Sequence, residues 1–100
     1  MTRDEIIEAI RDLAPHLRDE YGVASIGIFG SVARGDDGPG SDVDVFVRFA
    51  SEAKPSLGTF ADICIELEKA VGRQVDLVED HPGLRPRFRQ FVEEDLVSVA

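Results

Sequence analysis

Two aspartates, Asp42 and Asp44, stand two residues apart where an apolar segment begins, in "SDVDVFVRF". Side chains at positions i and i+2 of a strand lie on the same face, with Cα atoms about 6.6–6.8 Å apart. Two carboxylates placed in this way repel each other unless a hard cation binds between them, and carboxylate oxygens are ligands that such cations prefer. The spacing therefore indicates a cation site, with Val43 pointing the opposite way, into the core.

A third acid, Asp76, stands between Val75 and Leu77 in a second apolar segment. If the two segments form neighbouring strands, Asp76 lies on the same face as Asp42 and Asp44. Three converging carboxylates beside a phosphate-binding turn fit two-metal phosphoryl chemistry, in which the ions stand about 3.5–4 Å apart. The alternative is that all three are solvated acids, at the end of a turn, on a strand and at a sheet edge.

A phosphate-binding turn is predicted upstream of these acids, at Gly30-Ser31. An apolar strand ends there and a short helix can begin, so backbone N–H groups point outward without intrahelical partners. Glycine allows the backbone to approach a phosphate closely, the Ser31 hydroxyl adds a donor, and Arg34 can supply positive charge. The alternative for Gly30 and Ser31 is an ordinary turn in which the serine caps the helix.

The acids between these two motifs, Asp36 and Asp37, do not continue the cation site. An EF-hand calcium loop needs acids at alternate positions and a bidentate glutamate at its twelfth position. The twelfth residue counted from Asp36 is Val47. We therefore expect Asp36 and Asp37 to be solvated loop residues.

The composition indicates one globular domain, residues 1–100, with a modest core. The formal charge is −9, from 20 acids against 11 Lys and Arg, which disfavours nucleic acid as a partner because its phosphates attract a basic face. A metal-bridged nucleotide or a basic protein remains compatible with this charge. No apolar run approaches the roughly 20 residues of a membrane span. The single cysteine, Cys64, fits a reduced, cytoplasmic environment.

Hydrophobic periodicity predicts the elements that position these side chains. Helices are expected over residues 3–20, between Ser56 and Gly72 and from Pro86 onward, and strands over 24–29, 43–49 and 74–78, with a short final strand in "LVSV". The first helix has the Thr2–Glu5 spacing of a capping box. The order predicts an α/β fold built on a small mixed sheet with flanking helices.

Several other side chains are assigned to packing or to the surface. Phe88, Phe91 and Val92 are expected to face inward from the last helix. Cys64 lies on the apolar stripe of the middle helix, where packing in the core is expected. The alternating arginines of "RPRFR" are either a solvated helix face or contacts for phosphates or an acidic partner.

The segment "GSVARGDDGPGSDVDVFV" resembles the G-S-x-A-R-G-(x)5-S-D-x-D signature of the minimal nucleotidyltransferase domain, a branch of the DNA polymerase β-like superfamily. The resemblance spans almost the whole chain, and the third acid of the family aligns with Asp76. The sequence departs from the pattern at Gly40, where the family often has another polar residue, which should alter loop flexibility more than chemistry. The matching residues, in register, are Gly30, Ser31, Ala33, Arg34, Gly35, Ser41, Asp42 and Asp44.

The resemblance implies a polymerase β-like nucleotidyltransferase fold and a Mg²⁺-dependent reaction with ATP as substrate. Asp42 and Asp44 would hold Mg²⁺ against the nucleotide phosphates, and Asp76 would complete the metal site and help to deprotonate an acceptor hydroxyl. That hydroxyl would attack the α-phosphate in line, and pyrophosphate would leave. The implied nucleotide-binding residues are Gly30, Ser31, Arg34 and Ser41.

Chains of this size resemble MntA-type antitoxins, which pair with an all-helical HEPN toxin and transfer AMP from ATP to a toxin tyrosine. The implied partner is therefore a HEPN-family toxin. Two alternatives remain: an antitoxin that neutralises its partner by binding alone, and a small enzyme that nucleotidylates an antibiotic or another small molecule. The retained motif residues favour an enzyme over the binding-only antitoxin. The absence of a second domain to wall a pocket disfavours a small-molecule substrate.

Overall fold

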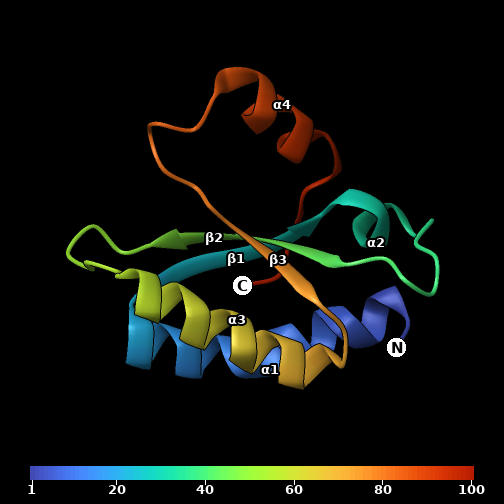
Figure 1. Cartoon of the computed structure of the whole chain (residues 1–100), viewed down its shortest axis with the longest axis horizontal. Coiled ribbons are helices and arrows are strands. Elements are labelled where there is room, and N and C mark those ends of the chain that lie inside the picture. Colours follow the sequence, from blue (N-terminus) through green and yellow to red (C-terminus); the bar gives the residue numbers. More distant parts are fainter.

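The chain folds around a four-stranded mixed sheet, and helices pack on both faces of this sheet (Figure 1). The computed structural model describes all residues, 1–100. The elements follow in the order α1 (Arg3–Tyr21), β1 (Val23–Phe29), α2 (Gly30–Arg34), β2 (Val43–Phe49), α3 (Leu57–Val71), β3 (Val75–Glu79), α4 (Pro86–Asp95) and β4 (Val97–Ser98). This order confirms the predicted α/β architecture, including the short final strand.

The strand order in the sheet is β3-β2-β1-β4. β1 is antiparallel to both β2 and β4, whereas β2 and β3 are parallel and are joined through α3, as a parallel pair requires a crossover connection. In this register Asp44 stands opposite Asp76 on β3 and opposite Phe29 on β1. The two acid-bearing strands are therefore neighbours, as the predicted acid cluster requires.

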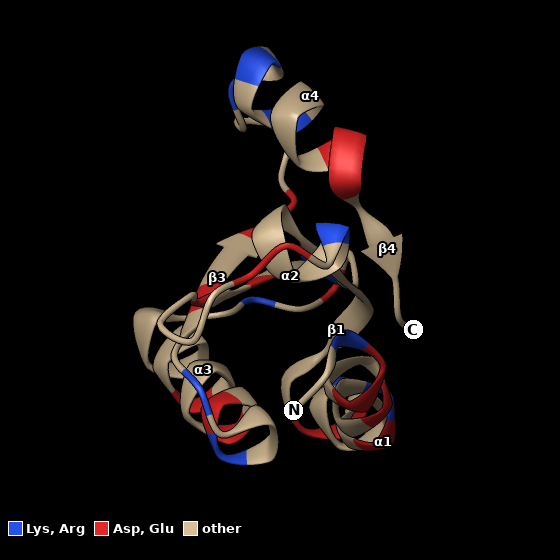
Figure 2. Ribbon diagram, turned by 90° about the vertical axis from the view of Figure 1, so that its right-hand side faces the viewer, with Lys and Arg blue, Asp and Glu red and all other residues tan.

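Helices α1 and α3 cover one face of the sheet and bury the main core (Figures 1 and 2). Because strand side chains alternate between faces, Val43, Val45 and Val47 point toward these helices and are fully buried. The helices contribute apolar stripes, whose fully buried members include Ile6, Ile10, Leu17, Ile63 and Leu67. None of the helices combines the length and the apolar character needed to cross a bilayer. The core thus anchors β2, the strand that begins beside Asp42.

The opposite face of the sheet is only partly covered, by α4 and, at one end, by the short α2 (Figures 1 and 2). Val92 of this helix is fully buried against Phe29 and Phe46, whose rings meet edge to face with centroids 6.1 Å apart. Asp44 lies two residues before Phe46 and therefore on the same face. α4 thus packs on the sheet face that also carries the predicted acids.

The prediction that Phe88 and Phe91 face inward is wrong. These residues are 38% and 51% exposed, and their rings stack on each other with centroids 6.2 Å apart. Val92 is the buried residue of α4, because the helix contacts the sheet along a stripe too narrow to include both phenylalanines. Cys64, by contrast, packs against the core as predicted, with its thiol donating to the Val75 carbonyl (3.5 Å).

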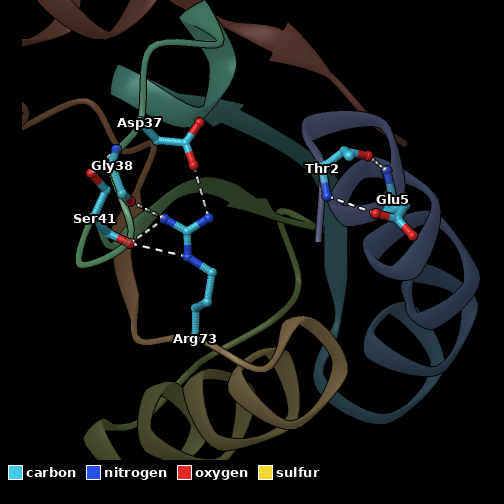
Figure 3. A network of polar contacts seen from close by, with 6 residues as sticks. All are labelled: Thr2, Glu5, Asp37, Gly38, Ser41 and Arg73. Atoms are coloured by element: carbon cyan, nitrogen blue, oxygen red, sulfur yellow. Dashed lines mark hydrogen bonds and ion pairs between the residues drawn. The ribbon is translucent and has the colours of Figure 1, made fainter.

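The first helix begins where the sequence predicts. The Thr2 hydroxyl accepts a hydrogen bond from the Glu5 N–H (3.2 Å), and the Glu5 carboxylate accepts one from the Thr2 N–H (2.7 Å) (Figure 3). This capping box satisfies N–H groups that the first helical turn leaves free. α1 ends at Gly22, whose φ of 77° suits glycine.

Substitutions at two leucines of α3 test how much the buried core contributes to the stability of the fold. Leu67 is fully buried, whereas Leu57 is 90% exposed. Leu67→Ala should lower the free energy of unfolding by about 2–5 kcal/mol, because it removes buried apolar surface and leaves a cavity. Leu57→Ala, the matched control, should change it by no more than about 0.5 kcal/mol. Urea denaturation of both variants measures the difference, and equal losses would contradict the assigned core.

Candidate active site

The three predicted acids lie where two parallel strands begin. Asp42 directly precedes β2, Asp44 is the second residue of β2, and Asp76 is the second residue of β3. The register places Asp44 opposite Asp76, on strands that lie about 4.8 Å apart. Asp44 is half-buried, whereas Asp42 and Asp76 are exposed. The fold therefore brings the three carboxylates to one end of the sheet face that α4 leaves open.

No basic side chain pairs with these carboxylates. None of the ion pairs within the chain includes Asp42, Asp44 or Asp76. Burial raises the pKa of Asp44, and the charges of Asp76 and then Asp42 raise this pKa further, while Arg34 lowers it. The three acids therefore repel one another, and this repulsion favours a bound cation.

These carboxylates do not form a complete metal site by themselves. No three His, Cys, Asp or Glu side chains gather closely enough to hold a metal ion among them. Mg²⁺ does not need such a cage, since proteins usually hold it with one or two carboxylates together with waters and substrate phosphates. The solvent-accessible pair Asp42 and Asp44 therefore fits a magnesium ion that binds together with a nucleotide.

Gly30 lies directly against the acid cluster. It begins α2 with a φ of 74°, a conformation that favours glycine. A Cβ atom at this position would fall on the carboxylate oxygen Oδ2 of Asp44. Gly30, in the predicted phosphate-binding turn, therefore lies directly against one of the three acids.

Arg34 and Ser41, the other predicted nucleotide-binding residues, make contacts within the chain. Arg34 pairs with Asp95 on α4 (2.8 Å) and with Asp36 (3.1 Å), and its hydrogen bonds to these two carboxylates raise its pKa. The Ser41 hydroxyl accepts a hydrogen bond from the Gly38 N–H (2.9 Å). Two of the three guanidinium nitrogens of Arg34, Nε and Nη1, are thus bound to carboxylates within the chain, whereas Ser41 shapes the loop before β2.

The expectation that Asp37 is a solvated loop residue is wrong. Its carboxylate pairs with Arg73 Nη1 (2.9 Å), and the two side chains are only 23% and 18% exposed. The hydrogen bond from Arg73 holds the pKa of Asp37 below its ordinary value. Asp36 is exposed, as predicted. The role of Arg73 could not be predicted from the sequence, because 36 residues separate it from Asp37 and no local pattern joins them.

The sequence matches a known family and named relatives. The family described as "Nucleotidyltransferase domain" matches residues 5–99. A protein of Methanocaldococcus jannaschii assigned as a protein adenylyltransferase is 38% identical over 98 residues, which cover 98% of each chain. The protein adenylyltransferase MntA of Thermococcus cleftensis is 41% identical over 78 residues, which cover 78% of this chain and 77% of that protein.

Solved structures share the fold. A protein assigned as a minimal nucleotidyltransferase superposes with a TM-score of 0.75 at 32% identity, covering 97% of this chain and 95% of that one. A complex of the tri-AMPylated HEPN toxin of Shewanella oneidensis with an MNT antitoxin contains a chain that superposes with a TM-score of 0.60 at 21% identity, covering 98% of this chain and 68% of that one. The predicted fold, of the polymerase β-like nucleotidyltransferase type, is thus confirmed.

Removing one charge from the acid cluster should stabilise the free protein. Because the folded state raises the pKa of Asp44, ionisation of this carboxyl lowers the free energy of unfolding as the pH rises through the raised pKa. Asp44→Asn should therefore raise the free energy of unfolding at pH 7 without divalent metal by about 0.2–1 kcal/mol, the size of a cross-strand charge pair. The gain should shrink as the pH falls toward the ordinary value of 3.8.

Urea denaturation across this pH range measures the effect, with Asp12→Asn on the exposed surface of α1 as the control for net charge. If Asp44→Asn proves less stable than wild type in EDTA at pH 7, Asp44 has a structural role that outweighs its repulsion by the other acids.

Alanine substitutions at two glycines with similar backbone conformations can distinguish the cost of backbone strain from the cost of a clash with Asp44. Gly30 and Gly35 have φ values of 74° and 81°, but a Cβ atom at Gly35 would meet nothing within 4 Å. Gly35→Ala should cost about 1–2 kcal/mol of stability from the left-handed backbone alone, and Gly30→Ala should cost more. Chemical denaturation should show this excess disappear in an Asp44→Ala background. An excess that persists there would contradict the contact.

Proposed function

The chain belongs to the nucleotidyltransferase domain family, and on that premise we propose that it is a Mg²⁺-dependent protein adenylyltransferase that transfers AMP from ATP to a tyrosine hydroxyl of a HEPN-family toxin, acting as its antitoxin. The observation that carries this proposal is the parallel register that sets Asp44 opposite Asp76, beside Asp42 and against Gly30. Carboxylates next to a glycine turn at the open end of a sheet are suited to phosphoryl transfer.

The motif residues have different roles in positioning the nucleotide. Asp42 and Asp44 would hold Mg²⁺, which when bound neutralises phosphate charge and draws the nucleotide to the acids. Gly30 lets the backbone approach the terminal phosphates, and the Ser31 hydroxyl donates a hydrogen bond to them. Arg34 contributes positive charge, and its Nη2, which the contacts with Asp36 and Asp95 leave unused, can donate to a phosphate oxygen.

The reaction forms one bond to phosphorus and breaks another. The acceptor hydroxyl oxygen attacks the α-phosphorus of ATP, and the bond between this phosphorus and the oxygen of the leaving pyrophosphate breaks. The hydroxyl proton passes to the Asp76 carboxylate, which is exposed and so accessible to an acceptor from outside. Positioning and charge neutralisation supply most of the rate enhancement.

A protein acceptor is supported by the surface around the acids as well as by the relatives. The net charge of −9 disfavours a nucleic acid. Phe88 and Phe91 are exposed on α4, the helix on the same sheet face as the acids, and exposed aromatic pairs are typical of protein contacts. The relative MntA is named a protein adenylyltransferase, and the HEPN toxin of the solved complex is AMPylated.

A binding-only antitoxin is the second candidate, because the partner of an MNT antitoxin in the solved complex is bound as well as AMPylated. The two functions differ in stoichiometry. An enzyme turns over, so a small molar fraction of this protein with ATP and Mg²⁺ should neutralise an excess of toxin. Neutralisation by contact needs at least one copy per toxin and does not depend on ATP.

Intact-mass spectrometry of a HEPN-family toxin that is supplied as the acceptor tests the proposal. After incubation with ATP and Mg²⁺, the toxin should gain mass in whole AMP units on a tyrosine, and EDTA should prevent the gain. Asp42→Asn and Asp44→Asn should abolish transfer, Asp76→Ala should slow it by about 10²–10⁴-fold, and Asp12→Asn should leave it unchanged. Stoichiometric, ATP-independent neutralisation without a mass change would exclude the enzyme and leave the binding-only antitoxin.

A further inference from the structure

A single arginine, Arg73, holds the loop that leads into the acid cluster. It lies in the short linker between α3 and β3. Besides its ion pair with Asp37, its guanidinium donates from Nε to the Ser41 carbonyl (3.2 Å) and from Nη2 to the carbonyls of Gly38 (3.4 Å) and Ser41 (Figure 3). All of these contacts reach the loop over residues 36–42, which joins α2 to β2.

Apart from the contacts of Arg73, the 36–42 loop is held to the rest of the chain at its start, where Arg34 pairs with Asp36 (3.1 Å), and at its end, where β2 begins. It contains Gly38 and Gly40, and glycine loses more backbone freedom on ordering than any other residue. Within the loop, the Ser41 N–H donates to the Gly38 carbonyl (3.1 Å), and the Ser41 hydroxyl accepts from the Gly38 N–H (2.9 Å). These bonds close a local turn, and Arg73 ties that turn to the α3–β3 linker.

Asp42 lies between two residues that this linker holds. On one side, the Ser41 carbonyl accepts hydrogen bonds from Arg73. On the other side, the Val43 N–H donates to the Gln74 carbonyl (2.9 Å). The linker continues directly into β3, the strand of the third acid. The position of Asp42 relative to the other acids therefore depends on the contacts of the linker.

We propose that Arg73, paired with Asp37, is a positioning residue of the active site that holds the 36–42 loop so that Asp42 can bind the metal–nucleotide. This inference rests on the proposed function, in which Asp42 is a metal ligand. Arg73 suits the role because a planar guanidinium contacts a carboxylate and two carbonyls at once, which a lysine ammonium cannot do in the same geometry. Asp37 offsets the charge of the arginine, and no ion pair joins the arginine to Asp42 itself.

A direct contact between Arg73 and a phosphate is the competing role. Arg73 and Asp42 line the same open hollow of about 300 Å³, together with Ser41 and Gln74, so a phosphate could reach the guanidinium. Its hydrogen bonds to the loop would then have to break. The two roles differ in what they require of the free protein, since only the positioning role requires the loop to loosen when Arg73 is replaced.

Hydrogen exchange on the nucleotide-free chain separates these roles. Arg73→Lys keeps the positive charge but loses the planar fork, and Asp37→Asn removes the ion pair with little change in shape. Both variants should speed amide exchange across the 36–42 loop and leave the β1 and β2 core amides unchanged. Arg11→Lys, on the exposed surface of α1, is the matched control and should change neither.

The Mg²⁺ concentration that the chain needs for ATP binding and for AMP transfer is the second quantity to measure. In calorimetric titrations with ATP, and in AMP transfer, the Mg²⁺ concentration for half-maximal effect should rise by about 10–100-fold in both variants, the usual cost of losing a residue that orients a metal ligand. Excess Mg²⁺ should restore much of the transfer rate. The double variant should be no worse than the more severe single one, because both changes break the same contact.

Two results would overturn the positioning role. Weaker ATP binding with unchanged loop exchange would mean that Arg73 contacts the phosphates itself, and a loosened loop with an unchanged Mg²⁺ requirement would mean that the contact is only structural. If Arg73→Lys does not fold, Asp37→Asn alone decides between these results. If the wild-type chain transfers no AMP, the proposed function fails, while exchange and Mg²⁺–ATP affinity still decide the role of Arg73.

Discussion

Like charges on one face of a sheet repel. The fold holds three acids close to one another without a basic partner, namely Asp42, Asp44 and Asp76. The other face of the same strand holds them in place, because Val43 and Val45 are fully buried there. Burying a valine side chain contributes about 1.5–3 kcal/mol, whereas a cross-strand charge pair costs roughly 0.2–1 kcal/mol. The core therefore outweighs the repulsion, and the three acids stay on this face without a basic partner.

The second face of the sheet, which carries Phe29, Asp44 and Phe46, has an apolar part and an acidic part. Phe29 and Phe46 are covered by Val92 of α4, so one part is apolar and buried. The other part, which begins at Asp44, stays open, and Gly30 keeps the chain close to it without a side chain in the way. One strand can thus contribute to packing on both faces and still present a carboxylate to solvent.

The arginines near this site are committed to acids outside the cluster. Arg34 pairs with Asp95, and Arg73 pairs with Asp37. Both cations therefore stabilise the surroundings of the site while leaving the cluster itself negative. A negative cluster would repel a bare triphosphate and attract one that carries a divalent metal, which is the form of substrate that the proposed function uses.

The order of helices and strands, the capping box and the spacing of the signature motif were determined by the sequence alone, because caps, hydrophobic periodicity and turn residues act over a few positions. Only the tertiary structure decided that Asp44 lies opposite Asp76 and that Arg73 binds Asp37. It also decided that Phe91 stays exposed despite its helical spacing, since a helix buries only what its partner surface can cover. These contacts join distant segments, and they form only when the packing of the sheet brings those segments together.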